Sequence, residues 1–456
     1  LNLLTVTAGT ANLGGDVSTT MTQTYGGAVT LSNDVVLTSS TNGAITFSGS
    51  VNSDGMARDL TLNSTASQFD GSVGGGSALD QITATGLTVS GTGSIINAGV
   101  IDVNGNAAIS GEIGSGTVAS LDVSGTTTLA DHVTTSGTQS YTGAVTLGAD
   151  VDLSGTTVTM SGDVNSSSAG TNILDITGNA VFGADVGTGT SLSTLSVSGT
   201  TSLAGDVTAT TQGYTGQVNL TGAASHTLTG AVTLSGGVDG TMTEALDIQG
   251  SLDLDGAATN LTALNVSGAS NLGADVSTSG SQTYTGTVTL SGGDRNLTST
   301  SGLVNIDGGL AGSGNGLTIT GDLDLTTSAM SGLTTLTVTD DASLGADITT
   351  SGIQSFGTGG TGTVTITTNV TLDSTGGSLV RFFGTVNSST TSTLTIADGD
   401  AQFDATVGGV NPLGGLSVEG ATTLGDGVGV AATTQSYTGQ VQLTGTTSTH
   451  TLTGAV

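Results

Sequence analysis

The chain has no cysteine and no tryptophan, a single proline (Pro412), and only 3% aromatic residues. Without thiols it can form no disulfide framework, and the absence of thiols over 456 residues is more usual outside the cell than inside it. So few bulky side chains also leave too little volume for a conventional globular core. These absences exclude a disulfide-stapled scaffold and favour an architecture with a narrow interior.

Positive charge is almost missing as well. There is no lysine, and the three arginines face 35 acidic residues, which gives a net charge of −32. A surface of this sign repels phosphate, so nucleic acid and anionic membrane surfaces are disfavoured partners. The sequence contains no signal peptide, transmembrane or lipidation pattern, and we expect no membrane insertion by this segment.

Short alternating runs of Leu, Val, Ile and Ala make up most of the hydrophobic 35%. In Ala144-Val145-Thr146-Leu147 the apolar residues take one face of a strand and small polar residues take the other. Turn residues such as Ser-Gly, Thr-Gly and Asn-Gly separate the runs. No stretch offers helical spacing, and Thr, Val and Gly at these densities are poor helix formers. The pattern predicts an all-β chain with one dry side to each strand.

A repeated phrase organises the chain. All five tyrosines follow a glutamine at the second position after it, and a phenylalanine fills this place in a sixth copy. The aromatic positions are Tyr25, Tyr141, Tyr214, Tyr284, Phe356 and Tyr437. A Leu-x-Val phrase precedes each glutamine by a nearly constant step of about 18 residues, at Leu4, Leu121, Leu195, Leu264, Leu336 and Leu416. A step this constant predicts that the two phrases lie on adjacent turns of a stack.

The same step recurs between other residues. Val51, Val164 and Val386 lie about 18 residues before Phe69, Phe182 and Phe403. We interpret the step as a turn of about 18 residues, with about four turns in each module of about 70 to 80 residues. A Leu-x-Val at Leu87 without a following Gln-x-Tyr marks residues 87 to 120 as a shortened module.

These features predict a parallel β-solenoid, formed by residues 1–456 as one continuous repeat domain. About 25 turns at a strand spacing of about 4.8 Å would give a rod on the order of 120 Å long. Because each strand has one dry side, six residues around one module are expected to point inward. They are Leu264, Val266, Leu272, Val276, Val288 and Leu290.

The stretches Leu121 to Leu147 and Leu264 to Leu290 resemble the repeat shafts of bacterial surface proteins in the filamentous haemagglutinin and β-strand-repeat adhesin group. The resemblance covers essentially the whole chain. It implies a right-handed β-helix that is secreted and displayed at the bacterial cell surface as a non-catalytic shaft, fibre or adhesin. The secretion domain and membrane barrel of a complete family member are not seen in these residues.

The residues at both ends of the sequence follow the repeat pattern. Residue 1 is Leu within a Leu-x-Val phrase, and His450 to Val456 copy His226 to Val232. We therefore expect a segment of a longer protein, which continues into further repeats or stacks end to end as a filament.

The aspartates allow two interpretations. They can populate turns and keep a long surface soluble, or they can bind calcium between turns, which needs six to eight oxygen ligands. The candidates for calcium are recurrent aspartates of Gly-Asp-Val or Gly-x-Asp-Val/Ile turns and one alternating pair: Asp16, Asp185, Asp206, Asp275, Asp347, Asp253 and Asp255. The Gly-Gly-x-Gly-x-Asp repeat of dedicated calcium solenoids is missing, so the turn interpretation is favoured and no other cofactor is expected.

The sequence gives little support for a catalytic function. Lyases and hydrolases built on β-helices need a positioned acid and base, often with a basic residue against the substrate. The three arginines lie far apart, His226 and His450 are copies of one repeat position, and His132 stands in a turn beside Asp131. We expect no enzyme.

Two functions from different classes stay open: a structural shaft, and a lateral surface that binds calcium or host or matrix glycans in adhesion or biofilm. The tyrosines could be exposed glycan contacts, or they could close the core while the glutamines stack in a ladder. Phe356 favours packing, because it keeps the ring and loses the hydroxyl. Arg381-Phe382-Phe383 is the chief non-repeated cluster, and we interpret it as a local irregularity of the core.

Overall fold

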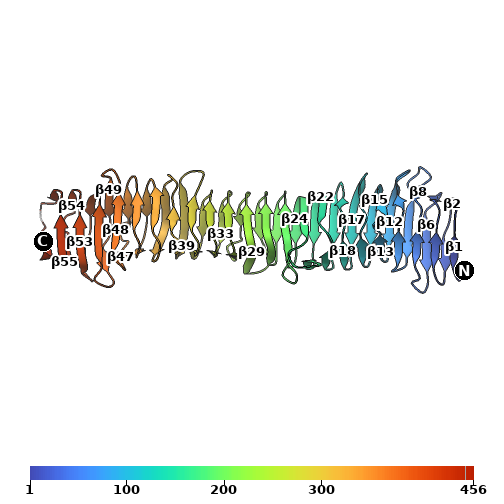
Figure 1. Ribbon diagram of the computed structural model, residues 1–456, viewed down its shortest axis with the longest axis horizontal. Coiled ribbons are helices and arrows are strands. Elements are labelled where there is room, and N and C mark those ends of the chain that lie inside the picture. The colour runs from blue at the N-terminus through green and yellow to red at the C-terminus, as the bar shows by residue number, and fades with distance from the viewer. Residues whose placement is uncertain (447) are drawn as a thin grey trace. The chain divides into compact units, whose positions relative to one another are not determined.

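The structure is a computed structural model that describes residues 1–446 and 448–456, all β with no helix in that part of the chain. Its contacts separate two compact units, unit 1 with Leu1–Ala223 and Thr229–Ala231 and unit 2 with Ala224–Leu228 and Val232–Val456. Each unit is a β-solenoid of stacked parallel strands (Figure 1), and the chain makes about 23 turns of about 20 residues. That one domain spans the whole chain stays a prediction.

The strands of unit 1 lie on three faces, and isolated bridges at Ile113 and Val186 take the place of a strand in two turns. Face A contains β1 (Leu4–Val6), β4 (Gln23–Tyr25), β7 (Ile45–Phe47), β10 (Ser67–Phe69), β13 (Leu87–Val89), β16 (Ala107–Ile109), β18 (Thr127–Leu129), β21 (Val145–Leu147) and β23 (Val164–Ser166). Face B contains β2 (Ala11–Leu13), β5 (Val29–Leu31), β8 (Val51–Ser53), β11 (Ser72–Val73), β14 (Ser94–Ile95), β19 (Val133–Thr134), the first halves of β22 (Val151–Met160) and β24 (Ile173–Phe182), β25 (Leu192–Val197) and the second half of β27 (Val207–Tyr214).

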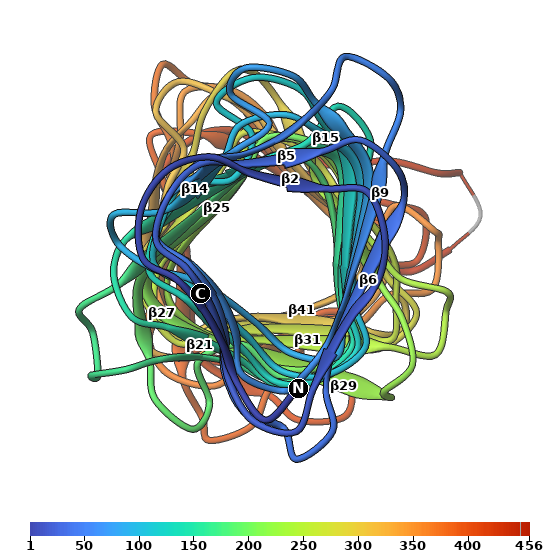
Figure 2. The ribbon, with the colours of Figure 1, turned by 90° about the vertical axis from the view of Figure 1, so that its right-hand side faces the viewer.

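Face C of unit 1 contains β3 (Val17–Thr19), β6 (Val35–Ser39), β9 (Asp59–Asn63), β12 (Leu79–Ala84), β15 (Ala98–Val103), β17 (Val118–Val123), β20 (Thr138–Tyr141), the second halves of β22 and β24, β26 (Thr201–Leu203) and β28 (Val218–Leu220). Seen from the N-terminal end in Figure 2, the coils of unit 1 run clockwise from β5 to β6 as they recede. The winding is therefore right-handed, as predicted.

Unit 2 repeats this plan. Face D contains β31 (Ala245–Gln249), β34 (Ala263–Val266), β37 (Gln282–Tyr284), the second halves of β39 (Arg295–Ile306) and β41 (Leu317–Leu325), β44 (Ala342–Leu344), β47 (Val364–Ile366) and β50 (Val386–Ser388). Face E contains the end of β29 (Ser225–Leu234), β32 (Leu252–Leu254), β35 (Ser270–Leu272), β38 (Val288–Leu290), β40 (Leu310–Ala311), β42 (Met330–Leu333), β45 (Ile348–Thr350), β48 (Val370–Ser374), β51 (Thr393–Ala397), β53 (Leu413–Val418) and β55 (Val430–Tyr437).

Face F contains β30 (Val238–Asp239), β33 (Ala258–Leu261), β36 (Val276–Thr278), the first halves of β39 and β41, β43 (Leu336–Val338), β46 (Gln354–Phe356), β49 (Leu379–Phe382), β52 (Asp400–Phe403), β54 (Thr422–Leu424) and β56 (Val441–Leu443). The last strand, β57 (Leu452–Ala455), pairs with β55.

The predicted pairing of the two phrases is confirmed at all six places. In unit 2, for example, Leu264 pairs with Gln282 and Val266 with Tyr284. The other five pairs have the same register. These steps are short because the three corners between the two phrases carry no long loop.

The second spacing was interpreted wrongly. Phe69 pairs with Phe47, and Val51 pairs with Val73, so the step from Val51 to Phe69 does not connect adjacent turns. The true partners lie further apart in the sequence, because the turns there carry longer corner loops. The same holds for Phe182, whose partner is Met160, and for Phe403, whose partner is Phe382.

The core is a column of stacked aliphatic side chains with short aromatic stacks. All six residues predicted to point inward are at most 1% exposed. Rings stack along the column at spacings of 5.0 and 5.3 Å from Tyr25 through Phe47 to Phe69, and of 5.4 and 5.1 Å from Phe356 through Phe382 to Phe403. Identical or similar side chains at one strand spacing make each turn bury the next.

Glycine permits close stacking at the corners. A Cβ added to Gly49 would lie 2.3 Å from the carbonyl oxygen of Gly27, and one added to Gly71 would lie 2.2 Å from that of Gly49. Backbone therefore packs on backbone where side chains would separate the turns. Among the described residues no helix has the length and apolarity to cross a membrane.

Candidate functional site

The Gln-x-Tyr phrase forms a buried corner. The tyrosine hydroxyl donates to the Oε1 of the glutamine that precedes it in the phrase, over 2.9 to 3.1 Å in the five tyrosine copies. The glutamine Nε2 donates in turn to two backbone carbonyls. For Gln139 these are Val133 O on the same turn, at 3.0 Å, and Ser154 O on the following turn, at 2.9 Å. Each corner therefore ties two turns together through a side chain.

Burial makes this corner strong and specific. All six glutamines are at most 5% exposed, so an unmade hydrogen bond there would leave a polar group without water. Burial also raises the pKa of the tyrosine hydroxyls, to about 12 at Tyr25 and Tyr437 and further at the other three. Four of the tyrosines are thus neutral donors within the core, as the packing interpretation predicted, and Tyr437 is half-buried.

The predicted glutamine ladder is wrong. Gln282 lies between Leu264 on one adjacent strand and Val304 on the other, so glutamine never stacks on glutamine there. The copies lie on different faces instead. Gln23, Gln139 and Gln212 lie on faces A, C and B of unit 1, and Gln282, Gln354 and Gln435 lie on faces D, F and E of unit 2. The hydrogen bond between the tyrosine hydroxyl and the glutamine was not predicted from the sequence, although the constant spacing of the two residues was a signal for it.

The corner at Phe356 is incomplete. Gln354 Nε2 donates to Ile348 O at 3.3 Å and Asp373 O at 2.9 Å, as in the other copies. Its Oε1, which a tyrosine hydroxyl would meet, is buried and has no hydrogen-bond partner in the described part of the chain. Phe356 preserves the ring stack with Phe382 and gives up one hydrogen bond.

Most of the aspartates proposed for calcium bond the next turn. The Oδ1 atoms of Asp16, Asp275 and Asp347 accept the backbone N–H groups of Val36, Asn296 and Thr371 at 2.9, 2.9 and 2.7 Å. Asp185 does the same for the N–H of Asp206, at 2.9 Å. Asn165 Oδ1 likewise accepts the backbone N–H groups of Gly189 and Thr190. This use of Asp and Asn at turns accounts for part of the large acidic excess.

The two aspartates of the alternating pair, Asp253 and Asp255, differ in their surroundings. Asp253 lies within β32 and accepts from Asn271 Nδ2 at 2.7 Å, whereas Asp255 is exposed in the turn that follows. Over the described residues, no group of three or more His, Asp or Glu side chains is arranged to hold a metal ion. Calcium binding by the seven aspartates stays a prediction.

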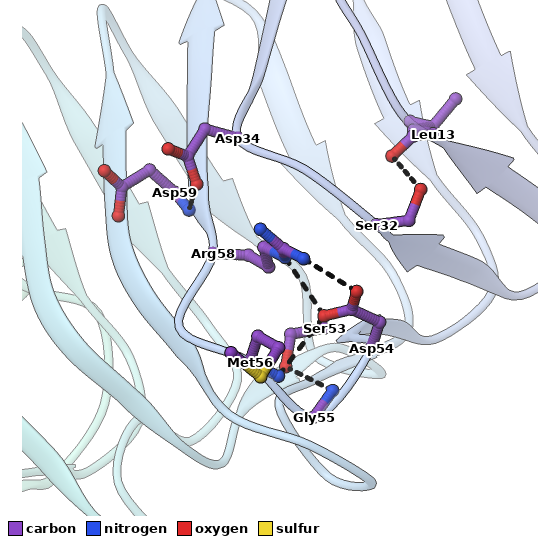
Figure 3. Close-up of polar contacts among 9 residues, drawn as sticks. All are labelled: Leu13, Ser32, Asp34, Ser53, Asp54, Gly55, Met56, Arg58 and Asp59. Atoms are coloured by element: carbon purple, nitrogen blue, oxygen red, sulfur yellow. Dashed lines mark hydrogen bonds and ion pairs between the residues drawn. The ribbon is translucent and has the colours of Figure 1, made fainter.

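A groove of about 350 Å³ opens beside an arginine loop of unit 1, where Met56 and Leu79 contribute to the lining. Arg58 holds the loop closed, because its Nε and Nη2 donate to both carboxylate oxygens of Asp54 at 3.0 and 2.8 Å (Figure 3). The hydrogen bond from Arg58 is the main reason that the pKa of Asp54 is lowered. This ion pair fixes the shape of the loop beside the groove.

Two further aspartates, Asp34 and Asp59, lie next to this loop. Asp34 Oδ1 accepts the backbone N–H of Asp59 at 3.1 Å (Figure 3). Burial, and then the charges of Asp34 and Asp80, raise the pKa of Asp59. The raised pKa has a local cause in stacked turns, and it does not identify a catalytic acid by itself.

A wider groove of about 440 Å³ lies on unit 2, with Asp322, Asp324 and Asp341 in its lining. Asp322 and Asp341 also bond the backbone of the next turn, since they accept the N–H groups of Asp341 and Thr363 at 3.0 and 2.6 Å. Burial raises the pKa of Asp324. Two of the three carboxylates thus have the same structural use as Asp16 and Asp275.

Comparison with known proteins identifies no relative. No family model matches the chain, and neither the curated proteins nor the solved structures gave a match. Function must therefore be inferred from the contacts of the chain itself.

Proposed function

We propose that this chain is a non-catalytic structural shaft, part of a fibre or adhesin displayed at a bacterial cell surface. The observation that carries the proposal is the Gln-x-Tyr corner. Its glutamine recurs on each of the three faces in both units, with Phe356 in place of the tyrosine in one copy, and each glutamine ties one turn to the following turn. The repeated residues thus serve cohesion between turns, which is what a load-carrying stack requires.

The surface chemistry supports the same role. The Asp and Asn side chains at the turns bond backbone groups of neighbouring turns, and each of the three arginines lies within 4 Å of an aspartate. The remaining charge is negative and spread along both units, which keeps an extended surface solvated and discourages indiscriminate association. We place the protein outside the cell on the same ground and on its lack of cysteine. Its proposed partners are further repeats or a second copy joined end to end.

Surface labelling tests this proposal. Antibodies raised against the folded 456-residue protein should label intact cells that produce it, and brief protease treatment of those cells should remove the label. Permeabilised cells provide the control for total protein. Labelling that appears only after permeabilisation would contradict a surface shaft.

A further inference from the structure

The three arginines differ in how much of the guanidinium is free. Arg58 uses Nε and Nη2 on Asp54, and Arg295 folds back so that Nε and Nη2 donate to Ser291 O at 3.0 and 2.7 Å. Arg381 donates only through Nε, to Asp404 Oδ2 at 2.7 Å. Neither terminal nitrogen of Arg381 has a hydrogen-bond partner within residues 1–446 and 448–456. Its side chain is also the most exposed of the three, at 35% against 21% and 12%.

The guanidinium of Arg381 is held in place on a ring. Its Cζ lies 4.0 Å from the centroid of Phe383, and Asp404 binds its Nε. Gln402 Nε2 donates to the other oxygen of Asp404 at 2.7 Å. A cation that is stacked and paired in this way loses little freedom on binding a ligand.

The cluster lies on the outer side of face F. Arg381 pairs with Ser355 on one adjacent strand and with Gln402 on the other. Phe382, between Arg381 and Phe383, is fully buried and belongs to the regular ring stack. The interpretation of these three residues as a core irregularity is therefore wrong: Phe382 continues the core, and Arg381 and Phe383 extend to the surface.

Together these groups offer donors, acceptors and an aromatic surface in one place. The terminal nitrogens of Arg381 supply up to four N–H donors, and the Oε1 of Gln402 and the carboxylate of Asp404 supply acceptors. The Arg381 and Asp404 charges balance each other. Vicinal hydroxyls can accept from the guanidinium and donate to the carboxylate at once, whereas an acidic ligand would meet Asp404 and the net charge of −32.

We infer that Arg381, Phe383, Gln402 and Asp404 form a lateral binding site for a neutral glycan. The sugar hydroxyls bridge Arg381 and Asp404, Gln402 Oε1 accepts a further hydroxyl, and the apolar side of the sugar ring lies against the exposed part of Phe383. The site goes beyond the shaft role and does not depend on it, because a shaft needs no particular residue at these positions.

A printed panel of neutral and acidic oligosaccharides, probed with the 456-residue protein, tests the site. The wild type should bind at least one neutral glycan, and Arg381→Lys and Phe383→Leu should each weaken that binding roughly tenfold or more. Arg58→Lys is the matched control, since Arg58 is an ion-paired arginine in a loop of unit 1, and the glycan binding of this variant should equal that of the wild type. Thermal melting of every variant separates lost binding from lost structure.

Three results would overturn the inference. One is binding to no neutral glycan, and another is neutral-glycan binding that persists in both the Arg381 and the Phe383 variants. The third is a preference for acidic over neutral oligosaccharides, which would make the cluster an anion site. None of these results bears on surface display, so failure here and failure of the shaft proposal can be told apart.

Discussion

At the scale of single residues, the most informative position is the incomplete corner at Phe356. We predict that Phe356→Tyr stabilises unit 2 by about 1 kcal/mol, because the new hydroxyl meets the unpaired Oε1 of Gln354. The other five corners show that the geometry accommodates this bond at 2.9 to 3.1 Å. Chemical denaturation, followed by hydrogen exchange of the face F amides, measures the gain.

The reverse substitution provides the control. Tyr284→Phe removes the hydroxyl that bonds Gln282 Oε1 at 3.1 Å and should destabilise the same unit by about 1 to 3 kcal/mol. If Phe356→Tyr is neutral or destabilising while Tyr284→Phe costs stability, the space beside Gln354 does not suit a hydroxyl.

Glu244 gives a prediction about pH. Its carboxylate is buried and accepts from the backbone N–H and hydroxyl of Thr241 at 2.7 and 2.9 Å and from the hydroxyl of Thr243 at 3.0 Å. These bonds, first the one from the Thr241 N–H, lower the pKa of Glu244 to about 2. Because the folded pKa lies below that of the unfolded chain, the stabilisation is present above about pH 4.5 and is lost as the pH falls towards 2.

Nuclear magnetic resonance titration of the Glu244 carboxyl carbon measures this directly. We expect a midpoint near pH 2 and faster amide exchange in the 241–244 turn once the carboxylate is protonated. A midpoint for Glu244 near the ordinary value of 4.5 would show that the turn does not hold the carboxylate as described.

At the scale of one strand, the alternation of inner and outer residues makes a sharp test. Val288 in β38 is fully buried, whereas its neighbour Thr289 lies on the outer side. Val288→Asp should cost at least about 4 kcal/mol, because it places an unpaired charge in the core, and should open the adjacent turns to protease. Thr289→Asp is the matched control and should change stability by no more than about 0.5 kcal/mol.

Equal protease resistance of the two variants would contradict the assignment of faces. The readout should be limited proteolysis with mass spectrometry, because opening is expected at the turns that contact β38. A stack with nearest-neighbour interfaces opens locally before it unfolds as a whole.

The sequence predicts the strands better than the turns between them. The step from Leu264 to Gln282 is correct because it runs from one corner to the same corner of the next turn with no variable loop between. The step from Val51 to Phe69 gave a wrong prediction of which residues lie on adjacent turns. Residues 54 to 58 form a longer loop at one corner, and Phe69 therefore lies opposite Phe47. Alternation fixes which side of a strand is buried, but loop length decides which strands become partners.

At the scale of the whole molecule, the repeats advance around the solenoid. The module that runs from Gln282 to Gln354 is not a whole number of turns, so the second corner lies on face F and the first on face D. The sequence shows the period of the phrase and cannot show this rotation, because the number of residues at each corner varies. The consequence is that all three faces of a unit receive the same inter-turn bond.

The candidate site was predictable only in part. The tyrosines were identified as core residues from Phe356 alone, yet their glutamine partners bond carbonyls of the next turn, which are distant in the sequence. The outward placement of Arg381 and Phe383 likewise follows from the burial of Phe382, which the sequence Arg-Phe-Phe does not reveal.

The claim that this protein is a stack of interchangeable turns, in which no single turn is essential, is tested most directly by deleting one turn. Removal of residues 270–287 joins Ala269 to Val288 and replaces Ser270 and Leu272 by their own partners, Val288 and Leu290. We predict that this variant keeps its β circular dichroism and protease resistance and melts cooperatively within roughly 5 °C of the wild type, since only one nearest-neighbour interface is lost. Deletion of residues 279–287, half a turn, should disrupt unit 2 because it moves every later strand to another face. If the whole-turn deletion unfolds unit 2 as completely as the half-turn deletion, the account of a modular shaft is wrong.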